Sequence, residues 1–103
     1  MSKQIKLEAR ERVAQILAAA LELAPSLGYS RLTRDDVAKR LGIPSSLIPY
    51  HMGTMAEFRR AIMREAVRVE CVAVIAQGLA VRDRHALKAP PHVKAAALQM
   101  LVS

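Results

Sequence analysis

The stretch TRDDVAKRLG at residues 33–42 decides the fold, because it has the pattern of one complete short helix. Thr33 has a side-chain oxygen that can accept a hydrogen bond from a free amide at the start of a helix. Asp35 and Asp36 follow, and carboxylates in the first turn oppose the helix dipole. Gly42 supplies the left-handed residue that commonly ends a helix. The pattern therefore predicts a helix of about two turns between Thr33 and Gly42.

A longer helix is predicted before this stretch. Apolar residues recur at i, i+3 and i+4 spacing from Val13 to Ala24, which is the pattern of a helix buried on one side. The ring of Pro25 would clash with the carbonyl of Leu21 in an undisturbed helix. We therefore expect this helix to start near the N-terminus, to end or bend around Ala24, and to be followed by a reversal at Gly28.

A second short helix is predicted after Gly42, from Pro44 or Ser45 to His51. Two short helices joined by a tight glycine turn, packed beneath a longer helix, describe a tri-helical, homeodomain-like helix-turn-helix unit. We expect residues 1–53 to form this unit, and its second short helix to leave one face free for a major groove.

The second half of the chain, residues 54–103, is predicted to form a long connecting helix and a C-terminal helix, which together make a dimerisation element. Thr54 and Glu57 have the spacing of a capping box. A long helix is expected from there to Gln77, with Gly78 as its stop. Because residues 66–76 place apolar groups on every side, this helix must be covered all round, and so short a chain can hardly supply both covers.

A polar connection at residues 82–91 follows, and Pro91 is well placed as the first residue of a last helix that reaches Leu101. The apolar stripe of that helix and the stretch 66–76 predict a two-fold dimer interface. The expected fold is thus all-α, with a long helix and a short C-terminal helix after the tri-helical unit. The expected dimerisation residues are Val67, Cys71, Val74, Ile75, Val93, Ala97, Met100 and Leu101.

Composition narrows the functional classes. The formal net charge is +7, which favours a polyanionic partner, and aromatic residues are only 3%, which suits closely packed helices. The lone cysteine, Cys71, indicates a reducing compartment, and the uncharged run 71–81 is too short to span a bilayer. We therefore expect a cytoplasmic protein without a membrane partner.

No catalytic or metal-binding pattern is found. Asp35 and Asp36 are adjacent, so they point about 100° apart on a helix, and capping accounts for them. His85 and His92 lie on either side of a Pro-Pro connection with no cysteine nearby, which disfavours a metal site. We expect a protein that is not an enzyme and that binds no cofactor and no metal.

Four blocks then resemble the N-terminal domain of the TetR family of transcriptional regulators, over roughly residues 10–68. They are ILAAALEL at 16–23, GY at 28–29, LTRDDVAKRLGI at 32–43 and YHMG at 50–53. The chain departs from the family pattern at Pro49, inside the second short helix, and at Met55, where the family often has a phosphate-binding lysine. It also has only residues 69–103 where the family has a large ligand-binding domain, so we expect no small-molecule effector.

The resemblance implies a recognition helix at residues 45–51. It implies base contacts from Ser45, Ser46, Leu47 and Tyr50, phosphate contacts from Thr33, His51 and Thr54, and a base or phosphate contact from Arg34. Hydroxyls, arginine and helix N-termini suit those contacts chemically. His51 can equally be a partly buried histidine, and Lys3, Lys6 and Arg10 can be either a minor-groove arm or solubilising charges.

The sequence therefore predicts a regulator that binds double-stranded DNA sequence-specifically, as a homodimeric repressor on a short inverted repeat. The alternative from another class is a helical protein-interaction module, such as an anti-repressor or adaptor that sequesters another regulator.

Overall fold

The structure, a computed structural model, describes residues 2–103, with side chains from Glu8 onward. The described chain is all-α, as expected, and contains seven helices and no strand. These are α1 (Ser2–Leu27), α2 (Arg34–Leu41), α3 (Leu47–Met52), α4 (Met55–Arg68), α5 (Val72–Ala80), α6 (Arg84–Leu87) and α7 (Pro91–Val102).

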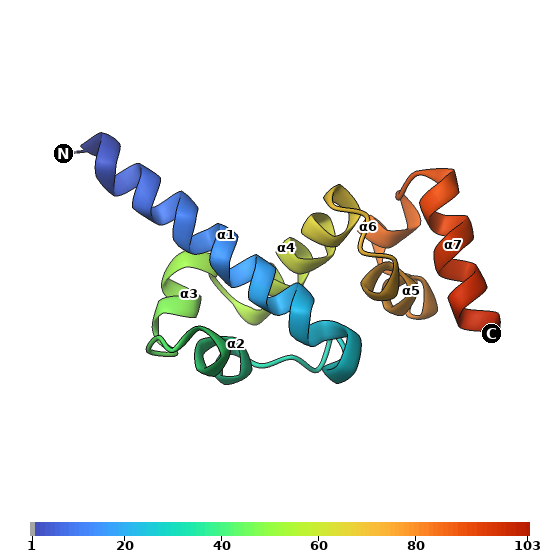
Figure 1. The fold of residues 1–103 in the computed structure, drawn as a ribbon, viewed down its shortest axis with the longest axis horizontal. Coiled ribbons are helices and arrows are strands. Elements are labelled where there is room, and N and C mark those ends of the chain that lie inside the picture. The colour runs from blue at the N-terminus through green and yellow to red at the C-terminus, as the bar shows by residue number, and fades with distance from the viewer. Residues whose placement is uncertain (1) are drawn as a thin grey trace.

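The helices form two groups joined by α4 (Figure 1). Helices α2 and α3 pack against each other and against α1, and the N-terminal half of α1 projects beyond them. Helices α5, α6 and α7 gather at the opposite end of the molecule, where the C-terminus lies. Helix α4 packs against α1 and α3 on one side and against α5 and α6 on the other, so it connects both groups.

Helix α1 continues through Pro25 to Leu27, so an end of the helix at Ala24 is wrong. Pro25 has no amide to donate to the Leu21 carbonyl, but it lies in the last turn of the helix, where the terminal carbonyls still find donors. The Gly28 amide donates to the Ala24 carbonyl at 2.7 Å, and Gln77 Nε2 donates to the same oxygen at 2.9 Å. The reversal then follows at Gly28, where φ is +90°.

Two predicted helix starts, at the N-cap residues Thr33 and Thr54, are confirmed. Each threonine hydroxyl accepts from the amide three residues later at 3.1 Å, and the carboxylates of Asp36 and Glu57 accept from the two threonine amides. Donation from these amides lowers the pKa of both carboxyls. Gly42 ends α2 in the left-handed conformation, with φ 68° and ψ 37°.

The expected long helix to Gln77 is wrong, because α4 ends at Arg68. Glu70 adopts a left-handed φ of 57°, the Cys71 amide donates to the Ala66 carbonyl at 2.7 Å, and the Glu70 amide donates to that of Val67 at 3.2 Å. This is the Schellman arrangement that closes a helix, here without the usual glycine. The chain folds back, so α5 packs against α4, α7 and α1.

Folding back covers much of the surface that the sequence assigned to a dimer. Val74, Ile75, Val93 and Ala97 are buried in the chain's own core, at 0–1% exposure, so these four are not available to a second copy in this fold. The chain thus covers part of its apolar stretch by itself, while Val69 stays 46% exposed and Val67 and Cys71 are half-buried. A single buried cluster runs from α1 to α7 instead.

Gly78 lies inside α5 and is buried, so it is not the helix stop that the sequence suggested. A Cβ atom at this position would lie 2.6 Å from Met63 Cε and 2.7 Å from Ala86 Cβ. The glycine therefore permits the close approach of α4 and α6 to α5. The last helix does begin with Pro91, as expected, and the short α6 before it is capped by Asp83.

A set of polar contacts ties the end of α1 to the C-terminal group. The buried Tyr29 donates its hydroxyl to Asp83 Oδ2 at 3.0 Å, and its amide donates to Gln77 Oε1 at 2.8 Å. Burial and then the hydrogen bond to Asp83 raise the pKa of Tyr29 to about 12. The neutral phenol is therefore the form that the fold stabilises.

This shift predicts a loss of stability in alkali that depends on Tyr29. The unfolded phenol ionises near pH 10, while the folded one holds its proton to about 12. Stabilisation by the phenol is complete below pH 10 and is lost as the pH rises to about 12, by on the order of 2 kcal/mol. Urea unfolding across this range should show that loss in the wild type and not in Tyr29→Phe. All other ionisable groups are the same in the two proteins, so equal losses would contradict the assignment.

Candidate nucleic-acid interface

Helix α3 begins later than the sequence predicted, at Leu47 rather than at Pro44 or Ser45. Ser46 is its N-cap residue, and the Ser46 side chain makes no capping hydrogen bond. Pro49 is therefore the third helical residue, where the missing N–H costs nothing because the first amides of a helix have no intrahelical acceptor. Ile48 points into the core, whereas Tyr50 is 80% exposed.

Four of the eight predicted DNA-binding residues line one groove of about 520 Å³ between the start of α2, the start of α3 and α4. We call it the arginine groove, because Arg31, Arg34 and Arg59 all line it. The predicted residues that it brings together are Thr33, Arg34, Ser45 and Ser46. Its other lining residues include Pro49 and Met55, which are the two departures from the family pattern.

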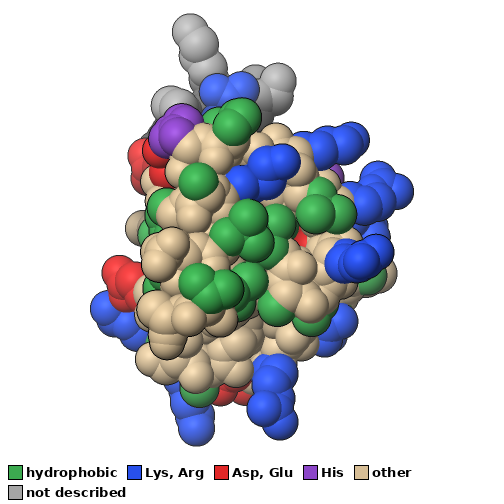
Figure 2. Space-filling model, turned by 90° about the vertical axis from the view of Figure 1, so that its right-hand side faces the viewer, with side chains coloured by type: hydrophobic (Ala, Val, Ile, Leu, Met, Phe, Trp, Pro, Cys, Tyr) green, Lys and Arg blue, Asp and Glu red, His purple; other side chains and the backbone are tan. Residues whose placement is uncertain are grey.

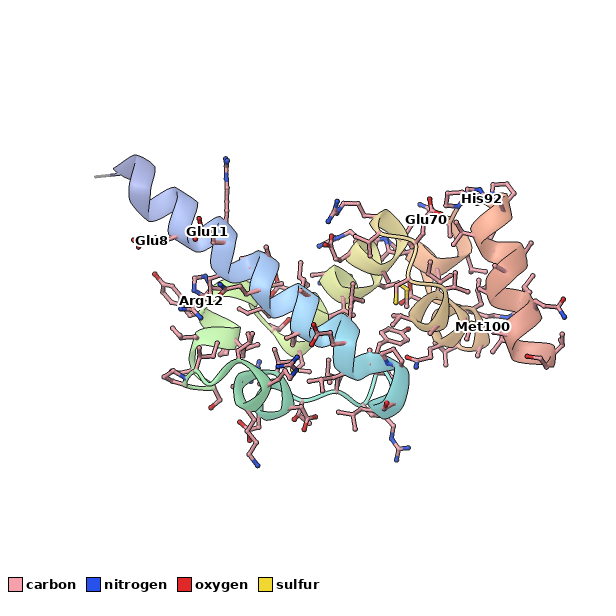
Figure 3. The ribbon with its side chains drawn as sticks, viewed as in Figure 1. Glu8, Glu11, Arg12, Glu70, His92 and Met100 are labelled. Atoms are coloured by element: carbon pink, nitrogen blue, oxygen red, sulfur yellow. The ribbon has the colours of Figure 1, made fainter. Side chains whose placement is uncertain are left out.

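Leu47, Tyr50 and His51 line a different hollow, of about 380 Å³, between α3 and the N-terminal half of α1. The rings of Tyr50 and His51 meet edge to face, with centroids 4.9 Å apart. His51 is half-buried there. Glu8, Glu11 and Arg12 line the same hollow, and Figure 3 shows the three on this part of α1, with Arg12 beneath the helix toward α3.

Thr54 lies at the start of α4, outside both hollows, and is exposed. Its amide is engaged by Glu57, as the amide of Thr33 is engaged by Asp36. Each threonine hydroxyl accepts a hydrogen bond and still has its own proton to donate. The two threonines can thus offer a hydroxyl to a phosphate, but not a free amide of their own.

The charges on the two sides of α3 differ. Within residues 8–103 arginine forms ion pairs at Arg40–Glu22 and Arg68–Glu65, so the three arginines of the groove have no carboxylate partner there. Among the lining residues only Asp35 opposes them. The hollow on the α1 side has Glu8 and Glu11 instead. A polyanion is therefore favoured on the α2 and α4 side of α3.

Arg31 and Arg59 line the arginine groove, although neither is among the eight residues predicted to bind DNA. Arg59 lies one helical turn after Met55, so a helical projection from Met55 indicates that both face the same side. Arg31 lies in the connection before α2, where no periodic signal exists. The side chains of Lys3 and Lys6, considered for a minor-groove arm, lie outside the described residues, and Arg10 is exposed on α1.

Comparison with known proteins identified no relative of this chain. No protein-family model, no curated protein and no solved structure matches the chain.

The predicted dimerisation residues that remain accessible lie mainly on α7. Met100 and Leu101 are exposed at 50% and 47%, and Val67 and Cys71 are half-buried. Leu98 and Val102, which the sequence analysis did not single out, are exposed on the same helix. Figure 2 looks onto this end of the molecule and shows apolar side chains gathered in the middle of the face, with Lys and Arg beside them.

Other surface features carry less chemistry. His92 Nε2 lies 3.3 Å from Glu70 Oε1, which links the start of α7 to the turn between α4 and α5 (Figure 3). Across the described residues, no three His, Cys, Asp or Glu side chains are grouped for a metal ion. None of the helices in that part of the chain has the length and apolarity needed to cross a bilayer.

Proposed function

We propose that this protein is a non-enzymatic, cytoplasmic regulator that binds double-stranded DNA sequence-specifically and acts as a homodimeric repressor. In this proposal α1, α2 and α3 form a helix-turn-helix unit, with α3 as its recognition helix. The observation that carries the proposal is the exposure of Ser46, the N-cap residue of α3, and of Tyr50 within α3, beside a groove whose arginines form no ion pair within residues 8–103. The resemblance to the TetR family supports the same assignment.

The chemistry of that face fits recognition of a duplex. Ser45 and Ser46 are exposed and offer hydroxyls to base edges or phosphates, and Tyr50 offers a flat ring with a polar tip. The adjoining arginine groove supplies the positive charge that duplex binding needs. In the proposed dimer, two recognition helices read the two halves of an inverted repeat.

Selection from random duplexes, followed by sequencing, tests the proposal. We expect the wild type to enrich an inverted repeat, and Tyr50→Ala or Ser46→Ala to weaken binding about tenfold or to change the selected bases. Both side chains are exposed, so neither change should unfold the protein. Ser26→Ala, at an exposed position in the last turn of α1, is the matched control and should select the wild-type repeat. No enrichment by the wild type would contradict the proposal.

The second candidate, a protein-interaction module, is favoured by one observation, the exposed apolar face of α7. Salt separates the two functions. Duplex binding should weaken steeply with added salt as counterions return to the DNA, whereas an apolar protein interface should not weaken.

A further inference from the structure

We propose that Arg31, Arg34 and Arg59 together form a binding site for one phosphate group of the DNA backbone. This inference rests on the proposed function and adds two residues to it, Arg31 and Arg59. It also assigns Arg34 to a phosphate rather than to a base edge.

Arg34 has a hydrogen-bond donor that no acceptor satisfies among the described residues. Its Nε atom is shielded from solvent and donates to no acceptor among the described residues. A buried donor without an acceptor is costly, and the cost is removed when an acceptor enters the groove. No carboxylate lies within ion-pair distance of Arg34 among residues 8–103, so the acceptor has to come from outside the chain.

The number of guanidinium groups in the groove also favours a phosphate. Three of them line the arginine groove against the single carboxylate of Asp35, and none is neutralised by an ion pair within residues 8–103. A base edge accepts two hydrogen bonds from one arginine and carries no net charge. A phosphate carries a full charge, and its oxygens accept bidentate hydrogen bonds from arginine. The charge of the groove therefore fits a phosphate better than a base.

Met55 and Arg59 lie on the same side of α4, facing the groove. Both line the arginine groove, and Arg59 follows Met55 by one turn of α4. Helix α4 therefore brings one cation, Arg59, to the side of the groove opposite the start of α2. Thr33 and Ser46 line the same groove and add hydroxyl donors to the guanidinium groups.

Binding to the selected duplex over a range of salt concentrations tests the site. We expect Arg59→Ala to raise Kd about tenfold and to reduce the slope of log K against log salt by about 1, on specific and scrambled duplexes alike. Arg59→Lys should keep the slope, because it keeps the charge. Arg84→Ala is the control, since Arg84 is exposed on α6 at the other end of the molecule. Equal effects of Arg59→Ala and Arg84→Ala would overturn the site.

A titration with inorganic phosphate separates this inference from the proposed function. The NMR signal of Arg34 Nε should shift in a saturable way in the wild type and in Arg84→Ala, and not in Arg59→Ala. If the wild type binds no duplex but shows this shift, the DNA function falls and the groove is a site for a free phosphate group. If neither duplex binding nor the shift depends on Arg59, the site itself is wrong.

Discussion

Replacing Gly78 with valine should destabilise the protein by about 3 kcal/mol, which is a large fraction of the stability of a small domain. A Cβ atom here would lie 2.6 Å from Met63 Cε and 2.7 Å from Ala86 Cβ. The end of a methionine side chain can move, but the Ala86 Cβ is fixed to the backbone of α6. Helix α6 must therefore shift, and valine adds two further methyl groups. Urea unfolding should show a lower midpoint with an unchanged slope.

Two comparisons separate this clash from the ordinary preference of a helix. Ala80→Val, at an exposed position of α5, should cost about 0.5 kcal/mol, because it changes only helix propensity. Gly78→Ala should lose less stability than Gly78→Val, and adding Ala86→Gly should recover part of that loss by removing the opposing Cβ. If Gly78→Val and Ala80→Val lose equal stability, the close packing of α5 on α6 is not what Gly78 provides.

Features set by neighbouring residues could be predicted from the sequence. Thr33 and Thr54 cap helices because a hydroxyl and a carboxylate three residues apart satisfy each other's amides, and Gly42 ends α2 because its φ of 68° suits glycine. These interactions need no knowledge of the rest of the chain. The resemblance likewise predicts that Thr33, Arg34, Ser45 and Ser46 contact the same DNA, and these four residues line the arginine groove.

Features set by distant residues could not be predicted. Glu70 adopts a left-handed conformation that usually belongs to glycine. The apolar side chains of residues 72–76 offset that strain, because they are buried when α5 folds back onto α4 and α7. Pro25 stays helical partly because Gln77, far along the chain, donates to the last turn of α1. Arg31 joins the arginine groove through the packing of α2 against α3. In each case a tertiary contact overrides the local signal.

The second large effect is expected on dimerisation, from changes to the exposed apolar residues of α7. Changing Leu98 and Leu101 together to aspartate should separate the proposed dimer into folded monomers. Both residues are about half exposed, at 52% and 47%, so the new carboxylates remain hydrated in a single chain. In a two-fold apolar interface, however, they would be buried opposite like charges, which is strongly unfavourable. Sedimentation should show half the mass, with an unchanged helical signal.

Binding to DNA should respond in a way that identifies the cause. Two linked recognition helices gain from effective concentration, so the double variant should lose on the order of 100-fold in affinity for a full inverted repeat and little for a half-site. Val74→Asp is the contrasting change, because Val74 is fully buried and a carboxylate there should unfold the chain itself. If the Leu98 and Leu101 variant stays dimeric, the two copies meet elsewhere, since the buried residues of α5 and α7 cannot supply the interface without opening the core.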